Sequence, residues 1–318
     1  MQACVLTKTG LRFNADYPSP VPQDGMVPVR VITAGVCETD LQLIKGYMGF
    51  QGVLGHEFVG VAEGGPFAGQ RVVGEINCAC HACDLCRDGM ENHCPNRTVI
   101  GILNHDGAFA ETVVVPHENL HLVPDNVSDD EAVFTEPLAA AFQIPAQLNL
   151  DAFDRAIVLG DGRLGNLCAQ VISHAGCHVT VVGKHAAKLA VLDELGINTA
   201  HLSDLVIDRT ADLVVDCTGS PTGLETACRL VRPRGTIVLK TTVAGDTGPA
   251  LAPVVIDEIT VVGSRCGPFD VALKALKQGD VHVAPLISAR FPLKEIDKAI
   301  NAARTAPNLK VLLDISSS

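Results

Sequence analysis

The sequence predicts an α/β protein in two parts, a β-rich antiparallel part followed by a doubly wound parallel sheet. From residue 1 to about 125, short apolar strands are broken by Gly and Pro, a pattern typical of antiparallel or barrel-like sheets. From about 155 to 262, continuous runs of Val, Ile and Leu alternate with helical segments, which indicates βαβ units around a sheet buried on both faces. The length of 318 residues fits two domains.

Composition excludes several classes of function. The chain has 24 basic and 36 acidic residues, and no run of Lys or Arg supplies the basic footprint of a nucleic-acid binder. No apolar run reaches transmembrane length, and "MQACVLTKTG" lacks the charged start and long apolar core of a signal peptide. We therefore expect a cytoplasmic protein with no membrane partner, whose twelve cysteines are metal ligands and buried thiols rather than disulfides.

The individual elements follow in order along the chain. The N-terminal strands include "VPVRVITAGVC", "FVGVAEGG" and "AFAETVVVP". Ser128 with Glu131 three residues later forms a capping-box pattern, which predicts that a helix begins there. The parallel strands are expected in "RAIVLG", "HVTVVG", "ADLVVDCTG" and "GTIVLK", and two amphipathic helices and a last strand, "KVLLDI", follow "VVGSRCG".

A glycine-rich turn joins the first parallel strand to an amphipathic helix that ends near Gly176. Gly160 makes the tight turn, Gly162 lets the backbone approach a pyrophosphate, and Gly165 lets helix and strand pack closely. The helix N-terminus offers its N–H groups to phosphate. A simple turn is the alternative, but the strand–helix context favours a dinucleotide site. The candidate cofactor-binding residues are Gly160, Gly162, Arg163, Leu164, Gly165, Gly183, Lys184, His185, Lys188, Thr218 and Gly219.

The second parallel strand ends in Gly183, Lys184 and His185. NAD sites place an Asp or Glu at this strand end to bind the ribose 2′-hydroxyl, and this strand end carries none. Lys184 and Lys188 could pair with the 2′-phosphate of NADP, so the sequence favours NADP over NAD. The alternative is a solvated loop whose lysines bind nothing.

Five cysteines crowd the segment "NCACHACDLCRDGMENHCP". Four of them, Cys80, Cys83, Cys86 and Cys94, have the spacing Cys-x2-Cys-x2-Cys-x7-Cys, which can surround one tetrahedral zinc ion. Four thiolates leave no open coordination position, so such a site is structural. An iron–sulfur cluster is an alternative because spacing alone does not identify the metal, and unrelated surface thiols are another.

A second, dispersed set of metal-ligating residues holds Cys37, His56, Glu57 and Glu136. A catalytic zinc site needs about three protein ligands and one open position, which such residue types can supply. Taken singly, Cys37 could be a buried thiol and His56 a core histidine. Glu136 could simply favour a helix N-terminus.

The motifs together are similar to those of the zinc-dependent medium-chain dehydrogenases/reductases, the alcohol and polyol dehydrogenase superfamily. They occur in family order over nearly the whole chain: "GVCETD", "GVLGHEFVG", the four-cysteine lobe, "GAFAE", "TEPLAAA", "VLGDGRLG" and "DCTG". The resemblance implies a GroES-like catalytic domain, a Rossmann coenzyme-binding domain, a site between them, and a dimer or tetramer of identical chains. The implied segments are 1–143 with a structural zinc lobe at 78–95, 144–265 for the coenzyme, and 266–318 returning to the catalytic domain.

The resemblance also implies roles for single residues. Cys37 and His56 would be ligands of the catalytic zinc, and Glu57 a ligand or a neighbour that exchanges with one. Glu136 stands where some members have a cysteine, as in the sorbitol, threonine and glucose dehydrogenase branch. Asp40 would orient His56, and the hydroxyl of Thr39 would take the substrate's proton. Some members continue this proton relay with a histidine where this chain has Gln42, so the onward path stays open.

The implied function is hydride transfer between a nicotinamide dinucleotide and an alcohol, polyol or sugar, with two zinc ions per chain. One alternative is an NADPH-dependent carbonyl reductase that works in the direction of reduction. The other is a non-enzymatic sensor that binds zinc and NADP.

Overall fold

The computed structural model describes residues 1–241 and 250–315, which form two compact units. The first unit holds Met1–Glu136, Ala272–Gln278 and the segment that begins at Ile287. The second holds Pro137–Val271 and Gly279–Leu286. The first border therefore falls inside helix α4 (Thr135–Gln147), somewhat before the expected residue 143, and part of the expected C-terminal return belongs to the second unit.

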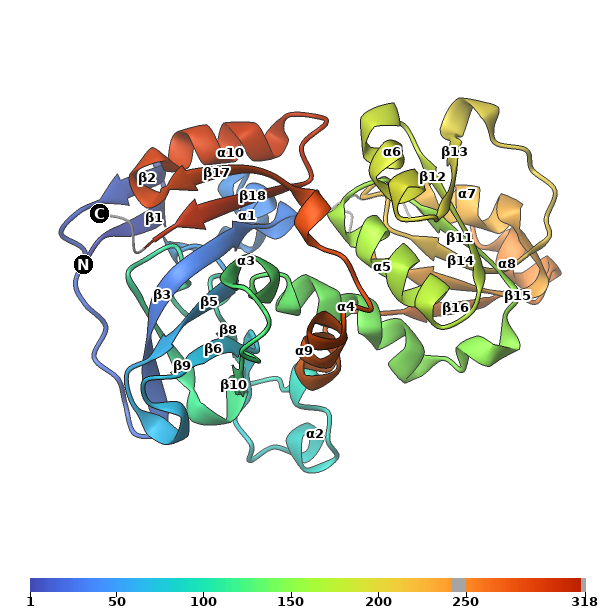
Figure 1. The fold of residues 1–318 in the computed structure, drawn as a ribbon. Helices are drawn as coiled ribbons and strands as arrows, with labels where there is room; N and C mark the ends of the chain where they lie inside the picture. The colour runs from blue at the N-terminus through green and yellow to red at the C-terminus, as the bar shows by residue number, and fades with distance from the viewer. Residues whose placement is uncertain (242–249, 316–318) are drawn as a thin grey trace. The chain divides into compact units, whose positions relative to one another are not determined.

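The first unit is built on β-sheets, as the sequence predicts (Figure 1). Its larger sheet has the order β10-β6-β5-β3-β18-β17, and β9 also pairs with β3. The C-terminal strand β18 is antiparallel to β3, so the end of the chain completes a sheet begun near the N-terminus. A smaller sheet has the order β2-β1-β4. The strands are β1 (Ala3–Thr7), β2 (Gly10–Asn14), β3 (Met26–Val36), β4 (Gly52–Val53), β5 (Glu57–Ala62), β6 (Arg71–Gly74), β9 (Thr112–Pro116), β10 (Leu120–Leu122), β17 (Ile287–Pro292) and β18 (Lys310–Asp314).

Short helices and a small ribbon complete this unit. Ser128 caps helix α3 as predicted: its Oγ accepts the backbone N–H of Glu131 at 3.3 Å, and Glu131 Oε2 accepts the N–H of Ser128 at 2.9 Å. The cysteine-rich segment runs between the two strands of a small ribbon, β7 and β8. The bounds are β7 (Asn77–Cys78), β8 (Thr98–Val99), α1 (Glu38–Ile44), α2 (Asp84–Arg87), α3 (Asp129–Ala132) and α10 (Ile296–Arg304).

The second unit contains a six-stranded parallel sheet of order β13-β12-β11-β14-β15-β16. The predicted parallel strands are β11, β12, β14 and β15, and the structure adds β13 and β16 at the edges. The bounds are β11 (Arg155–Leu159), β12 (His178–Gly183), β13 (Asn198–His201), β14 (Ala211–Asp216), β15 (Val231–Leu239) and β16 (Thr260–Gly263). The helices are α5 (Arg163–His174), α6 (Ala186–Glu194), α7 (Gly223–Leu230) and α8 (Ala252–Ile256). Helix α9 (Phe269–Gln278) begins in this unit, and its residues from Ala272 onward belong to the first unit.

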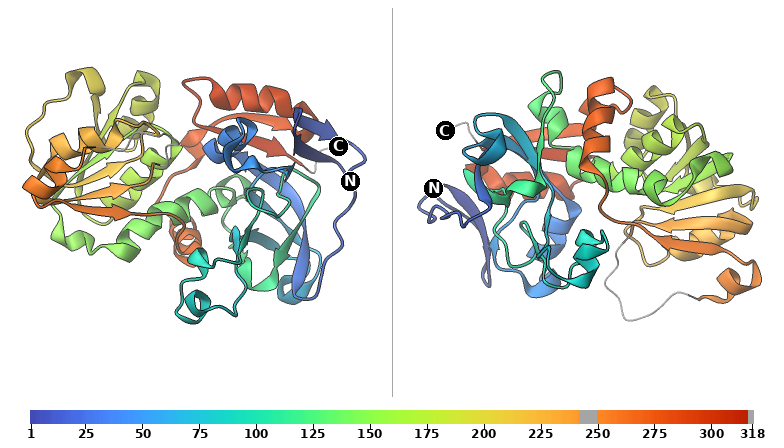
Figure 2. Two further views of the ribbon diagram at one scale, coloured as in Figure 1. Left: turned by 180° about the vertical axis from the view of Figure 1, so that it is seen from behind. Right: turned by 90° about the horizontal axis from the view of Figure 1, so that it is seen from below.

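The strand order reverses beside β11, and this reversal positions the candidate cofactor site. Because crossovers between parallel strands are right-handed, α5 and α6 cover one face of the sheet and α7 covers the other. Helices on both faces are visible in Figure 2. Ligands bind at the carboxyl ends of strands where such a reversal occurs, and the glycine-rich turn follows β11 at this point. Within the described residues, none of the helices has the length and apolarity that a bilayer crossing requires.

Two glycines of this turn should respond differently to a methyl group. A Cβ on Gly165 would lie 2.0 Å from the carbonyl oxygen of Gly160, whereas a Cβ on Gly162 would meet no atom within 4 Å. We expect Gly165→Ala to lower the free energy of unfolding by about 1–3 kcal/mol through overpacking. Gly162→Ala should change it by about 0.5 kcal/mol or less, as at an uncrowded surface position. Urea unfolding of both variants is the measurement, and equal stabilities would contradict the close packing of helix and strand.

Candidate functional site

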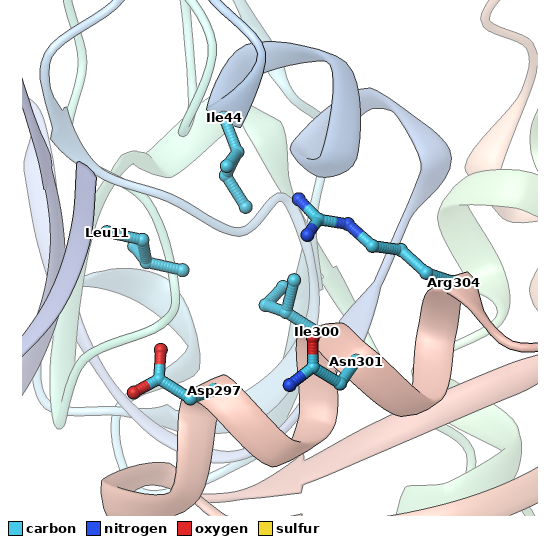
Figure 3. A pocket seen from close by; sticks show the side chains of 6 residues that line it. All are labelled: Leu11, Ile44, Asp297, Ile300, Asn301 and Arg304. Atoms are coloured by element: carbon cyan, nitrogen blue, oxygen red, sulfur yellow. The ribbon is translucent and has the colours of Figure 1, made fainter.

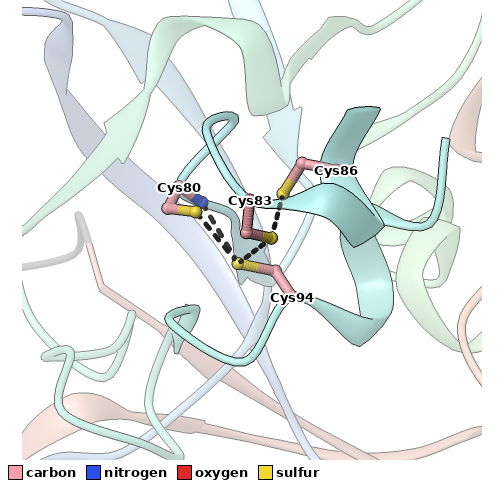
Figure 4. Close-up of side chains that lie close together, drawn as sticks. All are labelled: Cys80, Cys83, Cys86 and Cys94. Carbon is pink, nitrogen blue, oxygen red and sulfur yellow. Dashed lines mark hydrogen bonds between the residues drawn. The ribbon is translucent and has the colours of Figure 1, made fainter. Parts of the chain in front are cut away.

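Four cysteine thiols converge in the cysteine-rich lobe (Figure 4). The sulfur–sulfur distances are 3.4 Å for Cys83–Cys86, 3.8 Å for Cys83–Cys94 and 3.4 Å for Cys94–Cys80, and all four sulfurs lie within 4.8 Å of one another. Sulfurs around a tetrahedral zinc with Zn–S bonds of about 2.3 Å are about 3.8 Å apart. The structure therefore brings together the four residues that the spacing singled out, in an arrangement that fits a closed zinc site.

Hydrogen-bond donors surround these thiols. The backbone N–H of Cys80 donates to Cys94 Sγ at 3.4 Å, and Asn96 Nδ2 donates to Cys80 Sγ at 3.7 Å. The backbone N–H of Ala82 and the side chain of Asn96 lower the pKa of Cys80 to about 6. A thiol with this pKa is largely the thiolate at neutral pH, which is the form that binds metal.

A second cluster forms where β3 ends and β5 begins. Cys37 follows β3 and is the residue before helix α1. His56 directly precedes β5, and Glu57 is the first residue of that strand, which pairs with β3. One ligand atom from each of Cys37, His56 and Glu57 lies within 4.8 Å of the other two. Among the described residues, the group of ligand atoms within 4.8 Å of one another does not include Glu136. Its role as a further ligand therefore stays a prediction.

The buried carboxylate of Asp40 holds the two sides of this cluster together. Its Oδ2 accepts the backbone N–H of Cys37 at 2.9 Å, and its Oδ1 accepts that of Gly55 at 3.2 Å. The same Oδ1 lies 3.5 Å from Nδ1 of His56, within ion-pair range but long for a hydrogen bond. Asp40 thus fixes the backbone of Cys37 and that of Gly55, the residue before His56.

The histidine in this cluster has an unusual electrostatic environment. Burial by itself would lower the pKa of His56, but the negative charges of Asp40 and Cys37 outweigh it and raise the pKa well above the ordinary value. His56 Nδ1 has no hydrogen-bond partner within the described residues. Anionic groups gathered around a buried imidazole favour a cation at this place, and the sulfur, nitrogen and oxygen donors are those that zinc takes. The residues therefore fit a zinc ion.

Two polar side chains of α1 lie next to this cluster or just beyond it. Thr39 Oγ1 is 3.7 Å from Cys37 Sγ and is partly exposed, which suits a group that exchanges a proton with a substrate. Gln42 Nε2 donates to Glu38 Oε1 at 2.6 Å, and its amide is thereby directed along the surface of the helix.

Lys310, the first residue of β18, is a further residue of this cluster that the sequence analysis missed. Its side chain is completely buried, and its Nζ donates to Oε2 of Glu57. A Cβ on Gly35 would lie 2.6 Å from this Nζ and 2.8 Å from Oε2 of Glu57, so a larger residue at that position would force the pair to move. The available signal was a lysine at the head of the apolar strand "KVLLDI".

Burial also changes the acidity of this lysine. It lowers the pKa of Lys310 to about 8, and the nearby charges of Cys37 and Asp40 partly oppose that effect. The ammonium group lies 5.3 Å from the ring centroid of Phe134, a further favourable contact for a buried cation.

The glycine-rich turn has the geometry that its sequence predicts. Gly160 has a φ of 114°, which favours glycine, and Gly162 is the residue before the first turn of α5. A Cβ on Gly160 would lie 2.6 Å from the carbonyl oxygen of Cys217, just before Thr218 and Gly219. The loops after β11 and β14 therefore meet at the carboxyl edge of the sheet, with Arg163 and Leu164 opening the helix beside them.

The end of β12 holds a carboxylate that the sequence analysis did not expect. Asp161, between the first two glycines of the turn, accepts the backbone N–H groups of Lys184 and His185 at Oδ2, each at 2.7 Å. Nδ1 of His185 lies 3.0 Å from the same oxygen. The end of β12 itself carries no acidic residue, as its sequence indicates, but the carboxylate of Asp161 lies next to it.

A cavity of about 250 Å³ lies elsewhere in the first unit (Figure 3). It is lined by Leu11, Ile44, Asp297, Ile300, Asn301 and Arg304, none of which is a predicted site residue.

Comparisons with known proteins agree with this geometry. The model of the alcohol dehydrogenase GroES-like domain matches residues 23–125, and that of the zinc-binding dehydrogenase matches residues 164–278. A sorbitol dehydrogenase of Halalkalibacterium halodurans is 31% identical over 340 residues, covering 98% of this chain and 99% of the relative. A D-arabitol-phosphate dehydrogenase of Enterococcus avium is 29% identical over 326 residues, covering 94% and 92%.

Solved structures show the same fold over the whole chain. An alcohol dehydrogenase from Escherichia coli CFT073, complexed with NADH, has a TM-score of 0.90, 26% identity and 99% coverage of both chains. A zinc-binding dehydrogenase from Sinorhizobium meliloti 1021, bound to NADP, has a TM-score of 0.89, 27% identity and the same coverage. The chain therefore belongs to the zinc-dependent medium-chain dehydrogenases/reductases, alcohol-dehydrogenase-like oxidoreductases that use zinc and a nicotinamide dinucleotide.

Proposed function

We propose that this chain transfers a hydride between a nicotinamide dinucleotide and an alcohol, polyol or sugar, at a zinc ion held by Cys37 and His56. The convergence of Cys37, His56 and Glu57 within 4.8 Å carries this proposal. The polyol and polyol-phosphate dehydrogenases among the relatives support a hydroxyl-rich substrate. A zinc ion in this place supplies Lewis-acid polarisation of the substrate oxygen.

The side chains of the cluster divide the remaining tasks. Cys37 and His56 hold the metal. Asp40 fixes the backbone N–H of Cys37 and lies 3.5 Å from Nδ1 of His56, where its charge can act on the ring. Thr39, beside Cys37 Sγ, takes the proton of the substrate hydroxyl in the oxidative direction and returns it in reduction. Glu57 is either a direct ligand or a neighbour that exchanges with one, and Glu136 is the other candidate for the third protein ligand.

The remaining parts of the proposal concern the structural zinc, the dinucleotide site, and the assembly and location of the protein. The four thiols of the lobe hold a second, structural zinc, which the 3.4–3.8 Å sulfur separations support. The turn from Gly160 to Gly165, with Thr218 and Gly219, binds the dinucleotide through backbone N–H groups at the start of α5. We also propose a dimer or tetramer of identical chains in the cytoplasm, where cysteines remain reduced; the described chain contains no disulfide.

A substrate screen tests the proposed activity directly. Alcohols, polyols, sugars and aldehydes are offered with each dinucleotide, and the absorbance of the reduced nicotinamide reports turnover in either direction. Turnover of a polyol or sugar supports the proposal, and turnover of aldehydes alone supports a carbonyl reductase instead. Zinc and dinucleotide binding without turnover of any compound would favour the non-enzymatic sensor.

Removing one ligand of the catalytic cluster should separate chemistry from cofactor binding. We expect Cys37→Ser and His56→Ala each to lower kcat by more than about 100-fold, because several kcal/mol of transition-state stabilisation depends on the metal. The Kd for the dinucleotide should change by about twofold or less. The exposed His117 lies in the same unit, and His117→Ala is the matched control with unchanged kcat. Full activity in either ligand variant would refute the proposed site.

Removing one thiol of the lobe should affect stability first, because a closed site contributes folding energy. We expect Cys80→Ser to lower Tm by about 5 °C or more and to lose about one equivalent of zinc per chain. Cys78, a neighbouring thiol outside the cluster, provides the control Cys78→Ser, which should keep both zinc ions. Loss of catalysis with unchanged Tm and zinc content would contradict a structural site.

Breaking the buried pair of Lys310 and Glu57 should be costly because it leaves one charge uncompensated. We expect Lys310→Met to lower the free energy of unfolding by about 3–5 kcal/mol. The double variant Lys310→Met/Glu57→Gln removes both charges and should recover most of this loss. Urea unfolding of the three proteins checks the expectation, and a single variant as stable as the wild type would contradict the compensating role of Lys310.

A further inference from the structure

The space beside Gly183 is occupied by a side chain from another loop. In sheets that bind NAD, the residue at the end of the second strand is an Asp or Glu whose carboxylate accepts the ribose 2′-hydroxyl. Here that strand, β12, ends in Gly183. A Cβ on Gly183 would lie 2.5 Å from both Cβ and Oδ2 of Asp161. The carboxylate of Asp161 therefore fills the place that an acidic side chain on residue 183 would take.

This carboxylate is held in place from one side. Oδ2 accepts the backbone N–H groups of Lys184 and His185, and the ring of His185 contacts both oxygens. The side chain of Asp161 is only 10% exposed. Burial by itself would raise the pKa of Asp161, but the hydrogen bonds from His185 and Lys184 outweigh it and lower the pKa, so the group is ionised at neutral pH.

We infer that Asp161 selects the cofactor: its carboxylate accepts the ribose 2′-hydroxyl of NAD and repels the 2′-phosphate of NADP. The inference rests on the proposed dinucleotide site. It assigns to a residue of the glycine-rich turn the task that the end of the second strand usually performs.

The surroundings of Asp161 disfavour a phosphate in the same place. The backbone N–H groups of Lys184 and His185, which could donate to a phosphate, already donate to Asp161. Lys188 is partly buried: burial lowers its pKa, and the negative charge of Asp161 opposes that effect. Lys188 thus lies near enough to Asp161 for the two charges to interact. The preference for NADP that the sequence favours rests on Lys184 and Lys188 and on the lack of an acidic residue at the strand end, and Asp161 argues the other way.

The test measures binding of NADH and NADPH to the full chain by nicotinamide fluorescence, without any substrate. The wild type should bind NADH at least about 10-fold more tightly than NADPH. Asp161→Asn keeps an oxygen that can accept the two backbone N–H groups but removes the charge. It should weaken NADH several-fold and tighten NADPH, so that the ratio of the two Kd values shifts by about 10-fold or more. Glu194→Gln, an exposed change of the same charge on α6, should leave the ratio unchanged.

A relocated carboxylate provides the second test. Gly183→Asp alone would collide with Asp161, but Asp161→Gly/Gly183→Asp removes the collision and moves the acid to the strand end. We expect Asp161→Gly to lose the preference for NADH and the double variant to regain it. Thermal unfolding of each variant verifies that the protein is folded, and recovery in the double variant cannot come from a loss of structure.

The outcomes distinguish this inference from the proposed function. A wild type that binds both dinucleotides equally, or NADPH more tightly, overturns the role of Asp161 and leaves the dehydrogenase proposal standing. The same holds if Asp161→Asn weakens NADPH, since Asp161 would then act by orienting His185 toward a phosphate. A wild type that binds neither dinucleotide overturns both.

Discussion

The candidate catalytic site depends on the mutual compensation of charges buried in one part of the β-rich unit. Asp40, Glu57 and Lys310 are all shielded from water, and each would be strongly disfavoured alone. Backbone N–H groups satisfy Asp40, and Lys310 neutralises Glu57. The negative charges of Asp40 and Cys37 act on the ring of His56. A divalent ion fits this arrangement because the anionic groups outnumber the fixed cation. The candidate site is therefore a place where buried charges are stabilised only by one another and by backbone N–H groups.

Sheet topology makes this compensation possible. Gly35 and Glu57 face each other across β3 and β5, and β18 lies along the other edge of β3, where it brings Lys310 to the same place. Three segments far apart in the sequence thus meet at one point, and the missing side chain of Gly35 provides the space. The second unit has a similar arrangement, because the missing side chain of Gly183 leaves room for the carboxylate of Asp161. In both cases a glycine on one strand accommodates a charge supplied from elsewhere in the chain.

Local patterns in the sequence predicted much of this structure. The alternation of apolar runs with helical segments predicted the parallel sheet, and the glycine spacing predicted the turn after β11. The cysteine spacing predicted the cluster of four thiols. The capping box at Ser128 was also visible because it needs only two residues three positions apart. Such features are encoded within a few residues of one another, so their residue types and spacing are sufficient.

The features that were missed depend on residues that meet only after folding. Lys310 and Glu57 are brought together by strand order, and no local pattern connects them. Asp161 reaches the end of β12 because two parallel strands place their following loops side by side. The edge strands β13 and β16 are only four residues long and have no fully buried residue, so no long apolar run marks them in the sequence.

The position of Lys310 near the end of the chain has a consequence for the integrity of the protein. The thiol, the imidazole and both acids of the catalytic cluster are encoded in the first half, yet the cation that balances them arrives with the final strand. Loss of β18 would leave every candidate ligand in the sequence, but Glu57 would then be buried without its counter-ion. The candidate cluster therefore depends on β18 for its charge balance, although none of its predicted ligands lies on that strand.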